Sequence, residues 1–312
     1  MLRIDRTRQL GAALCVALFI TACTDHAFVS APPADGSVPP ALASKQGTTS
    51  GRILYYAGAP VQIYSMDDDG NNVLQLTTGS GPSLAPAWAP DGKRVLYASD
   101  GGFGPVAIYV MNADGTGKTR LTDPAPDELD SAPHALGKRV VFTRGGAGGI
   151  SLWAMNDDGS DPIRLTDGGL DLNPAPSPSG KQVAFVRFGD IHVLDLETGV
   201  LTNVTNTLGV FELTPAWSPT GKQIACAIVV VGQQSDIYVM NVDGTGVTQL
   251  TMTPNDEEST PRWSPDGKRI AFTATYGQRI GTWVMFADGT GLNDLTRTHT
   301  PYVDERLGAW AR

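Results

Sequence analysis

The chain has 312 residues, of which 18% are charged and 7% aromatic, with 36 glycines and 22 prolines. This length can hold one large β domain or two ordinary domains, and the turn-rich composition excludes a protein built mainly from long helices. The formal net charge is −9, and no stripe of lysine and arginine offsets it. Such a chain has no electrostatic reason to bind nucleic acid, so we expect no nucleic-acid partner.

The N-terminus has the pattern of a targeting segment. A basic stretch, MLRIDRTRQ, precedes the apolar run LGAALCVALFITA, which is too short to cross a bilayer but has the length of a signal-peptide core. The run ends in ITAC, which resembles the lipobox of bacterial lipoproteins. That resemblance implies a signal peptide over residues 1–22 and acylation of Cys23, whereas the alternative is ordinary cleavage nearby with Cys23 as a bystander. Thr24 stands where a retention aspartate would be, which favours the outer membrane, facing the periplasm or the cell surface.

Residues 23–50 form the next segment. After Cys23 they read TDHAFVSAPPADGSVPPALASKQGTTS, with no apolar period and many Pro, Ala, Ser and Gly residues. This composition is typical of a flexible linker. We therefore expect a tether between the lipidated cysteine and a folded domain over residues 51–312.

The folded region consists of one repeated unit. Copies of one sequence read WAPDGKRVLY from Trp88, WSPTGKQIAC from Trp217 and WSPDGKRIAF from Trp263. Weaker copies begin at Pro133 and Pro176. The glycines of this turn, Gly92, Gly137, Gly180, Gly221 and Gly267, are 41–46 residues apart. Intervals of this size, with several short strands in each, predict the blades of a β-propeller.

Each repeat divides into four strands. In the copy around Trp263, PRW and RIAFTA flank the tight turn SPDG, TWVMF follows a variable loop, and NDLT follows the hairpin ADGTG. The third strand carries a ring-bearing residue in all six copies, which we interpret as packing between blades: Tyr64, Tyr109, Trp153, His192, Tyr238 and Trp283.

The two ends of the folded region complement each other. The first copy, RILYYA, lacks its Trp-containing strand, and the chain finishes with LGAWAR, which is that strand. The C-terminal strand is therefore expected to complete the sheet that the N-terminal three strands begin. The predicted fold is all-β: a closed six-bladed β-propeller of four-stranded antiparallel blades.

The repeat PxWSPDGKRIAF…IYVMNxDGTG…LT resembles that of TolB-like propeller proteins, which also occurs in the propellers of prolyl oligopeptidase-type peptidases. The resemblance covers residues 52–312 and implies a stand-alone propeller that binds proteins or small ligands at one face. The peptidases add an α/β-hydrolase domain, but no G-x-S-x-G motif occurs here. A function taken from the fold alone rests on analogy.

The loops of variable length, which join the second to the third strand and the fourth to the first, are expected on one face of the propeller. Binding usually depends on such loops. Five fourth-to-first loops share a carboxylate three residues before the proline or its counterpart: Asp130, Asp171, Glu212, Glu258 and Glu305. One hypothesis is an acidic rim that holds a cation or a basic partner, and the other is a repeated structural cap.

Five residues of the same loops are not repeated, so they are the stronger candidates for specificity: Arg144, Arg187, Phe188, Tyr276 and Arg279. We expect no metal and no cofactor, because the histidines of the folded region should not converge and no phosphate-binding loop is present. No catalytic set can be picked out.

Two functions remain open at this stage. The first is a lipid-anchored, monomeric propeller in the bacterial envelope that binds a protein, peptide or glycan and touches the membrane only through its lipid. The alternative is a lyase or hydrolase for polysaccharide, with carboxylates at the channel mouth as acid and base.

Overall fold

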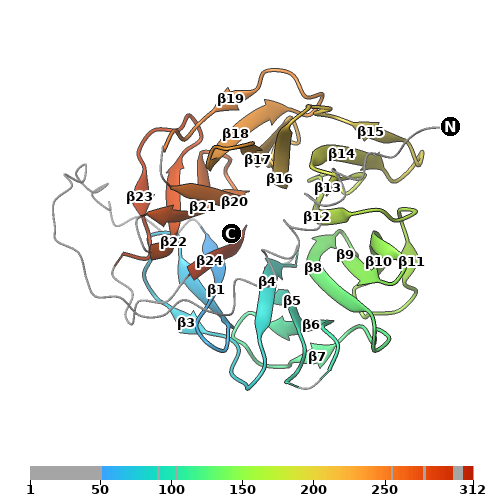
Figure 1. Ribbon diagram of the computed structural model, residues 1–312. Coiled ribbons are helices and arrows are strands. Elements are labelled where there is room, and N and C mark those ends of the chain that lie inside the picture. Colours follow the sequence, from blue (N-terminus) through green and yellow to red (C-terminus); the bar gives the residue numbers. More distant parts are fainter. Residues whose placement is uncertain are drawn as a thin grey trace. The chain divides into compact units, whose positions relative to one another are not determined.

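A computed structural model describes residues 51–89, 92–102, 104–253, 256–276, 279–297 and 305–311. They belong to one compact unit, Gln46–Arg312. Cys23, the expected signal peptide and the expected tether lie outside the described residues. Within them the regular structure is entirely β, arranged as six four-stranded antiparallel sheets around a centre (Figure 1). The described part of the chain holds no helix long and apolar enough to cross a membrane.

The first three blades are built from the first half of the unit and its last strand. Blade 1 contains β24 (Glu305–Ala311), β1 (Arg52–Ala57), β2 (Gln62–Asp67) and β3 (Leu74–Gln75). Blade 2 contains β4 (Ser83–Trp88), β5 (Arg94–Ser99), β6 (Ala107–Asn112) and β7 (Thr119–Arg120). Blade 3 contains β8 (Leu129–Leu136), β9 (Arg139–Gly146), β10 (Gly149–Asn156) and β11 (Ile163–Arg164).

The other three blades follow in chain order. Blade 4 contains β12 (Asp171–Pro176), β13 (Gln182–Arg187), β14 (Asp190–Asp195) and β15 (Leu201–Asn203). Blade 5 contains β16 (Val210–Trp217), β17 (Gln223–Val230), β18 (Ser235–Asn241) and β19 (Thr248–Gln249). Blade 6 contains β20 (Glu257–Trp263), β21 (Arg269–Tyr276), β22 (Arg279–Phe286) and β23 (Asn293–Asp294).

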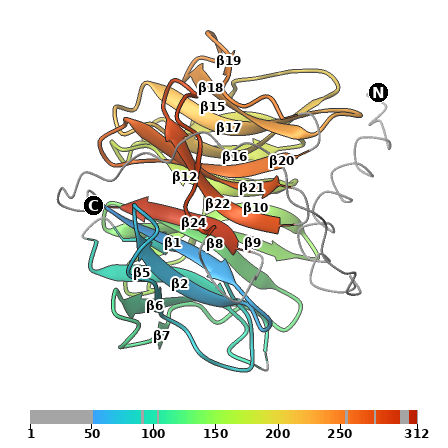
Figure 2. The same ribbon diagram turned by 90° about the vertical axis from the view of Figure 1, so that its left-hand side faces the viewer.

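The ring is closed, as the sequence predicts. The first strand of each blade lies innermost and contacts the first strands of both neighbours, from β4 through β8, β12, β16 and β20 to β24 and back to β4. Strand β24 pairs with β1 from Arg52↔Ala311 to Ala57↔Glu305, and Figure 2 shows the two side by side. Closure covers the edge of β1 that would otherwise be unpaired.

A β-bulge recurs in the first strands. In blades 2–6 the register shifts beside a non-glycine residue in the left-handed region, and these residues are Ala85, Ala132, Asn173, Thr214 and Thr260. A proline follows each of them directly in the sequence. A bulge accepts proline because the missing N–H is not needed for the ladder there. The repeated proline therefore marks a bend of the innermost strand.

The Leu-Thr or Val-Thr pair that closes each repeat has a structural explanation. In every blade the threonine Oγ1 accepts a hydrogen bond from the backbone N–H of a third-strand residue fourteen positions earlier, at 2.8–3.1 Å. These threonines are Thr77, Thr122, Thr166, Thr205, Thr251 and Thr296. Each threonine lies two residues after the short outer strand, so the bond ties the end of that strand to the third strand.

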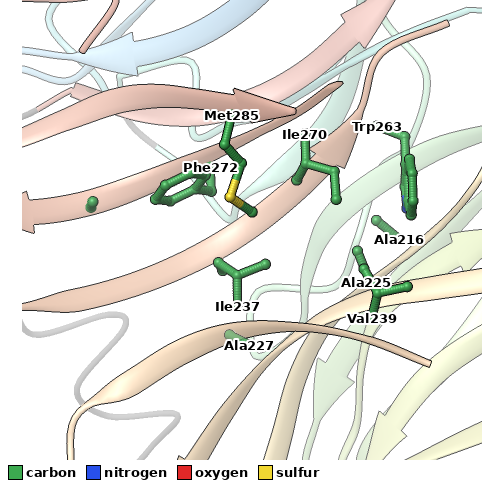
Figure 3. Close-up of a cluster of buried hydrophobic side chains, with 10 residues drawn as sticks. Ala216, Ala225, Ala227, Ile237, Val239, Trp263, Ile270, Phe272 and Met285 are labelled. Atoms are coloured by element: carbon green, nitrogen blue, oxygen red, sulfur yellow. The ribbon is translucent and has the colours of Figure 1, made fainter. Parts of the chain in front are cut away.

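The core consists of apolar layers between neighbouring blades. Between blades 5 and 6, Phe272, Ile270 and Met285 pack against Ile237 and Val239, and all five are buried (Figure 3). Five of the six ring-bearing residues of the third strand, all except His192, pack at the borders of such layers. Within blades they also stack on the second strand, as Tyr64 does on Tyr55 with centroids 5.4 Å apart. A blade alone would expose these layers, so the repeats depend on their neighbours.

Candidate functional site

The two ends of the blades form different surfaces. The loop face carries the second-to-third and fourth-to-first connections, and the turn face carries the tight first-to-second and third-to-fourth turns. The glycine of the SPDG turn, Gly267, has φ +70°, which explains its place in the repeat. All five carboxylates and all five non-repeated candidates lie at the loop-face end of the blades.

The five carboxylates lie inside the first strands rather than in the preceding loops where the sequence analysis placed them. Asp130 is in β8, Asp171 begins β12, Glu212 is in β16, Glu258 is in β20 and Glu305 begins β24. Their exposed fractions are only 0–3%. The strands begin earlier than expected, and four of the five side chains have partners on the adjacent strand or in the preceding loop. These carboxylates therefore do not form a solvated rim.

In blades 3 and 4 the carboxylate is paired with an arginine on the adjacent strand. Arg144 donates from Nε and Nη2 to the two oxygens of Asp130, at 2.6 and 2.8 Å. Arg187 binds Asp171 with the same two distances. The aspartate hydrogen bonds raise the pKa of both arginines. Each guanidinium also lies over a phenylalanine ring, Arg144 over Phe142 and Arg187 over Phe185. Four sequence-predicted residues thus form two buried ion pairs.

In blades 5 and 6 threonines replace the arginine. Glu212 accepts hydrogen bonds from Thr205 and Thr207, at 2.9 and 2.5 Å. Glu258 accepts from Thr251 at 3.3 Å and from Thr253. Burial raises the pKa of Glu212, and burial together with the nearby Asp236 raises that of Glu258 to about 8. A hydroxyl does not offset a buried negative charge as a guanidinium does.

The remaining candidates differ in their environments. Glu305 lies near Tyr55, whose pKa is raised by burial and then by the Glu305 charge. Tyr276 packs on Trp283 with centroids 4.2 Å apart, and burial and the charge of Glu258 raise its pKa. Arg279 forms an ion pair with Asp294 at 3.3 Å. Phe188 has φ +54° and is 45% exposed.

Four exposed apolar side chains lie on loops of the loop face, and the sequence analysis named only Phe188 among them. We call this group the loop-face patch and define it as Phe188, Leu208, Val231 and Met252. Leu208, Met252 and Val231 are 86%, 79% and 70% exposed. Backbone hydrogen bonds join their loops across blades 4 and 5, from Glu212 N to Gly189 O at 2.7 Å and from Val231 N to Gly209 O at 3.5 Å. The signal in the sequence was a set of apolar residues in loops, outside the repeated pattern.

A second feature, at the turn face, was also missed. A cavity of about 460 Å³ opens at the centre of the ring and is lined by two sixfold positions of the first strands. One position is occupied by Trp88, Ala135, Pro176, Trp217, Trp263 and Trp310. The other, which we call the inner ring, is occupied by Ala87, His134, Ala175, Ala216, Arg262 and Ala309. Alignment of the residue before each tryptophan, or before its counterparts Ala135 and Pro176, would have revealed that two blades depart from alanine.

No convergent metal-binding group is found among the described residues. His134 lies at the turn face and His192 is in β14, while His299 falls outside the described residues. Burial and then the Arg262 charge lower the pKa of His134 to about 4. His134 is therefore uncharged at neutral pH.

Comparisons with known proteins agree with this architecture. The crystal structure of TolB from Acinetobacter baumannii superimposes with a TM-score of 0.74 at 26% identity, covering 85% of this chain and 67% of that one. A putative TolB from Agrobacterium tumefaciens gives 0.66 at 21% identity, over 82% and 98% of the two chains. The Tol-Pal system protein TolB of Blochmanniella pennsylvanica is 38% identical over 40 residues, which are 13% of this chain and only 9% of that relative's length.

The family model described as the TolB beta propeller domain matches residues 52–190 and 172–309. Together these matches span all six blades. This chain of six four-stranded blades therefore belongs to the TolB beta propeller domain family.

Proposed function

We propose that this protein is a binding scaffold of the bacterial envelope whose loop face docks onto a protein partner. The observation that carries the proposal is the loop-face patch. Its three most exposed members are large apolar side chains on non-repeated loops of neighbouring blades. Exposed apolar groups that gather on one surface are typical of protein interaction sites.

The hydrogen bonds between loops support a preformed surface. The bonds at Gly189 and Gly209 tie the loop of Phe188 to β16, and the loop of Leu208 to that of Val231. Thr253 N donates to Asp236 Oδ1 at 3.3 Å, which ties the segment after Met252 to the start of β18. Loops held in this way lose little conformational entropy when a partner binds.

The family relationship supports the choice of a protein partner. One relative is named as a protein of the Tol-Pal system, which implies work alongside other proteins. The buried carboxylates favour docking over the polysaccharide-cleaving alternative. Asp130 and Asp171 are held by arginines, and Glu212 and Glu258 by threonines. An acid–base pair must reach its substrate, and side chains this buried do not.

Capture from envelope extracts tests the docking proposal. The chain bearing Leu208→Ser and Met252→Ser should lose the proteins that the wild type retains, because the centre of the patch becomes polar. Val200→Ser with Val247→Ser is the matched control, since both valines are over half exposed but precede fourth strands near the turn face. Retention of the same partners by the loop-face variant would refute the assignment of this face.

We further propose that Cys23 is acylated and anchors the propeller to the outer membrane through a flexible tether. Support comes from the sequence pattern ITAC and from the Pro/Ala/Ser/Gly-rich segment after it. Cys23→Ala should move the protein from the detergent phase to the aqueous phase in Triton X-114 partitioning. The lipid anchor would be contradicted if Cys23→Ala stays in the detergent phase and neither the wild type nor the variant incorporates labelled fatty acid.

A further inference from the structure

The inner ring of the cavity departs from its symmetry at Arg262. Four blades carry alanine at this position, blade 3 carries His134 and blade 6 carries Arg262. In each blade this residue pairs with the equivalent position of the second strand, as in Ala216↔Ala225 and Arg262↔Ala271. The blade therefore does not need a long or charged side chain here. The two exceptions call for another explanation.

Arg262 has no carboxylate partner among the described residues. Its Nε donates to Gly308 O at 2.8 Å and its Nη1 to Pro261 O at 2.9 Å. A guanidinium carries five N–H bonds. The two N–H bonds on Nη2 and the second N–H bond on Nη1 have no acceptor among the described residues. Arg144 and Arg187 at the loop face differ from Arg262, because the Nε of each lies 2.6 Å from an aspartate oxygen. The two carbonyl bonds orient the guanidinium without neutralising it.

The surroundings make this charge costly without an anion. Burial lowers the pKa of Arg262 to about 10, which still leaves it charged at neutral pH. His134 on the same ring adds no charge, because its pKa is lowered to about 4. Arg262 is partly buried, and a partly buried cation without a counter-ion costs free energy that a bound anion recovers in part. The cavity thus contains one positive charge and no negative charge from the described lining residues.

The shape and the walls restrict the class of anion. The free N–H bonds on Nη1 and Nη2 form the planar fork that binds both oxygens of a carboxylate. Indole and proline side chains, including Trp217, Trp263 and Pro176, line the cavity around this fork. The volume of about 460 Å³ is within the range of small-molecule sites. A ligand with one carboxylate and a compact apolar or ring-shaped remainder fits these features.

We propose that the turn-face cavity binds a small carboxylate-bearing ligand, whose carboxylate pairs with Arg262 and whose body packs against the surrounding tryptophans. The carboxylate belongs either to the C-terminus of a short peptide or to a sugar acid. This site is on the opposite face from the loop-face patch, so it is independent of the docking proposal.

Two matched ligand pairs test this site on the full chain. Acetyl-Gly-Leu with a free carboxylate is compared with its C-terminal amide, and galacturonic acid is compared with galactose. Binding is measured by calorimetry and by quenching of tryptophan fluorescence. At least one acid should bind, and its neutral counterpart should bind at least about tenfold more weakly, because a charge-assisted hydrogen bond contributes about 1.5–3 kcal/mol. The acid that binds identifies the source of the carboxylate.

Variants at one position separate recognition from folding. Arg262→Ala introduces the residue that four other blades carry, so the propeller should fold, and binding of the acid should weaken at least about tenfold. Arg262→Lys keeps the charge but not the fork, and its affinity should be intermediate. Arg120→Ala at the outer strand β7 is the control and should bind as the wild type does.

Three results would overturn the proposal: neither acid binds, a neutral analogue binds as well as its acid, or Arg262→Ala binds unchanged while its thermal unfolding stays normal. Failure of the capture experiment on the loop face would leave this site unaffected. Loss of carboxylate binding in a folded Arg262→Ala chain, with partner capture retained, would show that the two faces act separately.

Discussion

A chain that ends at residue 304 is expected to lose its cooperative fold. Removal of β24 deletes the strand that pairs with β1 over Arg52–Ala57 and withdraws Leu307 and Trp310 from the core. Withdrawal of each of these two side chains costs about 2–5 kcal/mol. Together with the lost strand pairing, this approaches the whole stability of about 5–15 kcal/mol that is typical of a domain. Circular dichroism should show no sharp thermal transition, and size exclusion should show expanded or aggregated protein.

The control for this deletion is a chain shortened by Arg312 alone, which should melt as the full chain does. A synthetic peptide of residues 305–312 should restore part of the transition when added to the truncated chain, because the exposed edge of β1 is a template for one strand. A truncated chain that melts at the wild-type temperature would mean that blade 1 is stable with three strands.

The second large effect is expected at the Asp130–Arg144 pair. Arg144→Met should destabilise the protein by about 3–5 kcal/mol, because it leaves the carboxylate of Asp130 buried without its guanidinium. The double variant Asp130→Leu/Arg144→Met should recover much of this loss, since no uncompensated charge remains. Chemical denaturation of the single and double variants measures the coupling between the two sites.

An exposed pair provides the comparison. Arg120 and Asp123 lie 3.0 Å apart with side chains 41% and 90% exposed, and Arg120→Ala should cost less than about 1 kcal/mol. If Arg144→Met costs no more than Arg120→Ala, the Asp130–Arg144 pair is not a structural element. Arg144 would then be free to serve as a binding residue of the loop face.

The sequence predicted the fold because the fold depends on features that every blade repeats. The spacing of the turn glycines, such as Gly221 and Gly267, indicated propeller blades, and the six copies of the third strand indicated their number. The unmatched LGAWAR at the end gave the closure, which the pairing of β24 with β1 confirms. A repeat can be recognised in one sequence since each copy serves as an alignment of the others.

The environments of the candidate residues could not be predicted in the same way. The carboxylates share a position in the repeat, but whether Asp130 faces water or Arg144 depends on a bulge beside Ala132 and on the neighbouring strand. Five equivalent carboxylates therefore acquire arginine partners in two blades and threonine partners in two others. The sequence pattern shows the shared position, and only the packing shows the partner.

Arg262 illustrates the opposite difficulty. An alignment of the copies shows only that blade 6 carries arginine where four blades carry alanine. The role that we propose for Arg262 depends on the closed ring, which brings six equivalent positions together around one cavity. A single charged side chain among alanines becomes a candidate site only after the blades are placed around their axis.

The placement of both faces depends on the ring being closed by β24, and an engineered disulfide between Arg52→Cys and Ala311→Cys tests this directly. Opposite residues in an antiparallel pair have Cα atoms about 4.5–5.5 Å apart, within the range of a disulfide. In a chain with Cys15 and Cys23 replaced by serine, mass spectrometry should find this bond within one molecule, and Arg52→Cys with Ala113→Cys should not form one. Free thiols at both positions, or a bond that forms only between two molecules, would contradict the closed propeller.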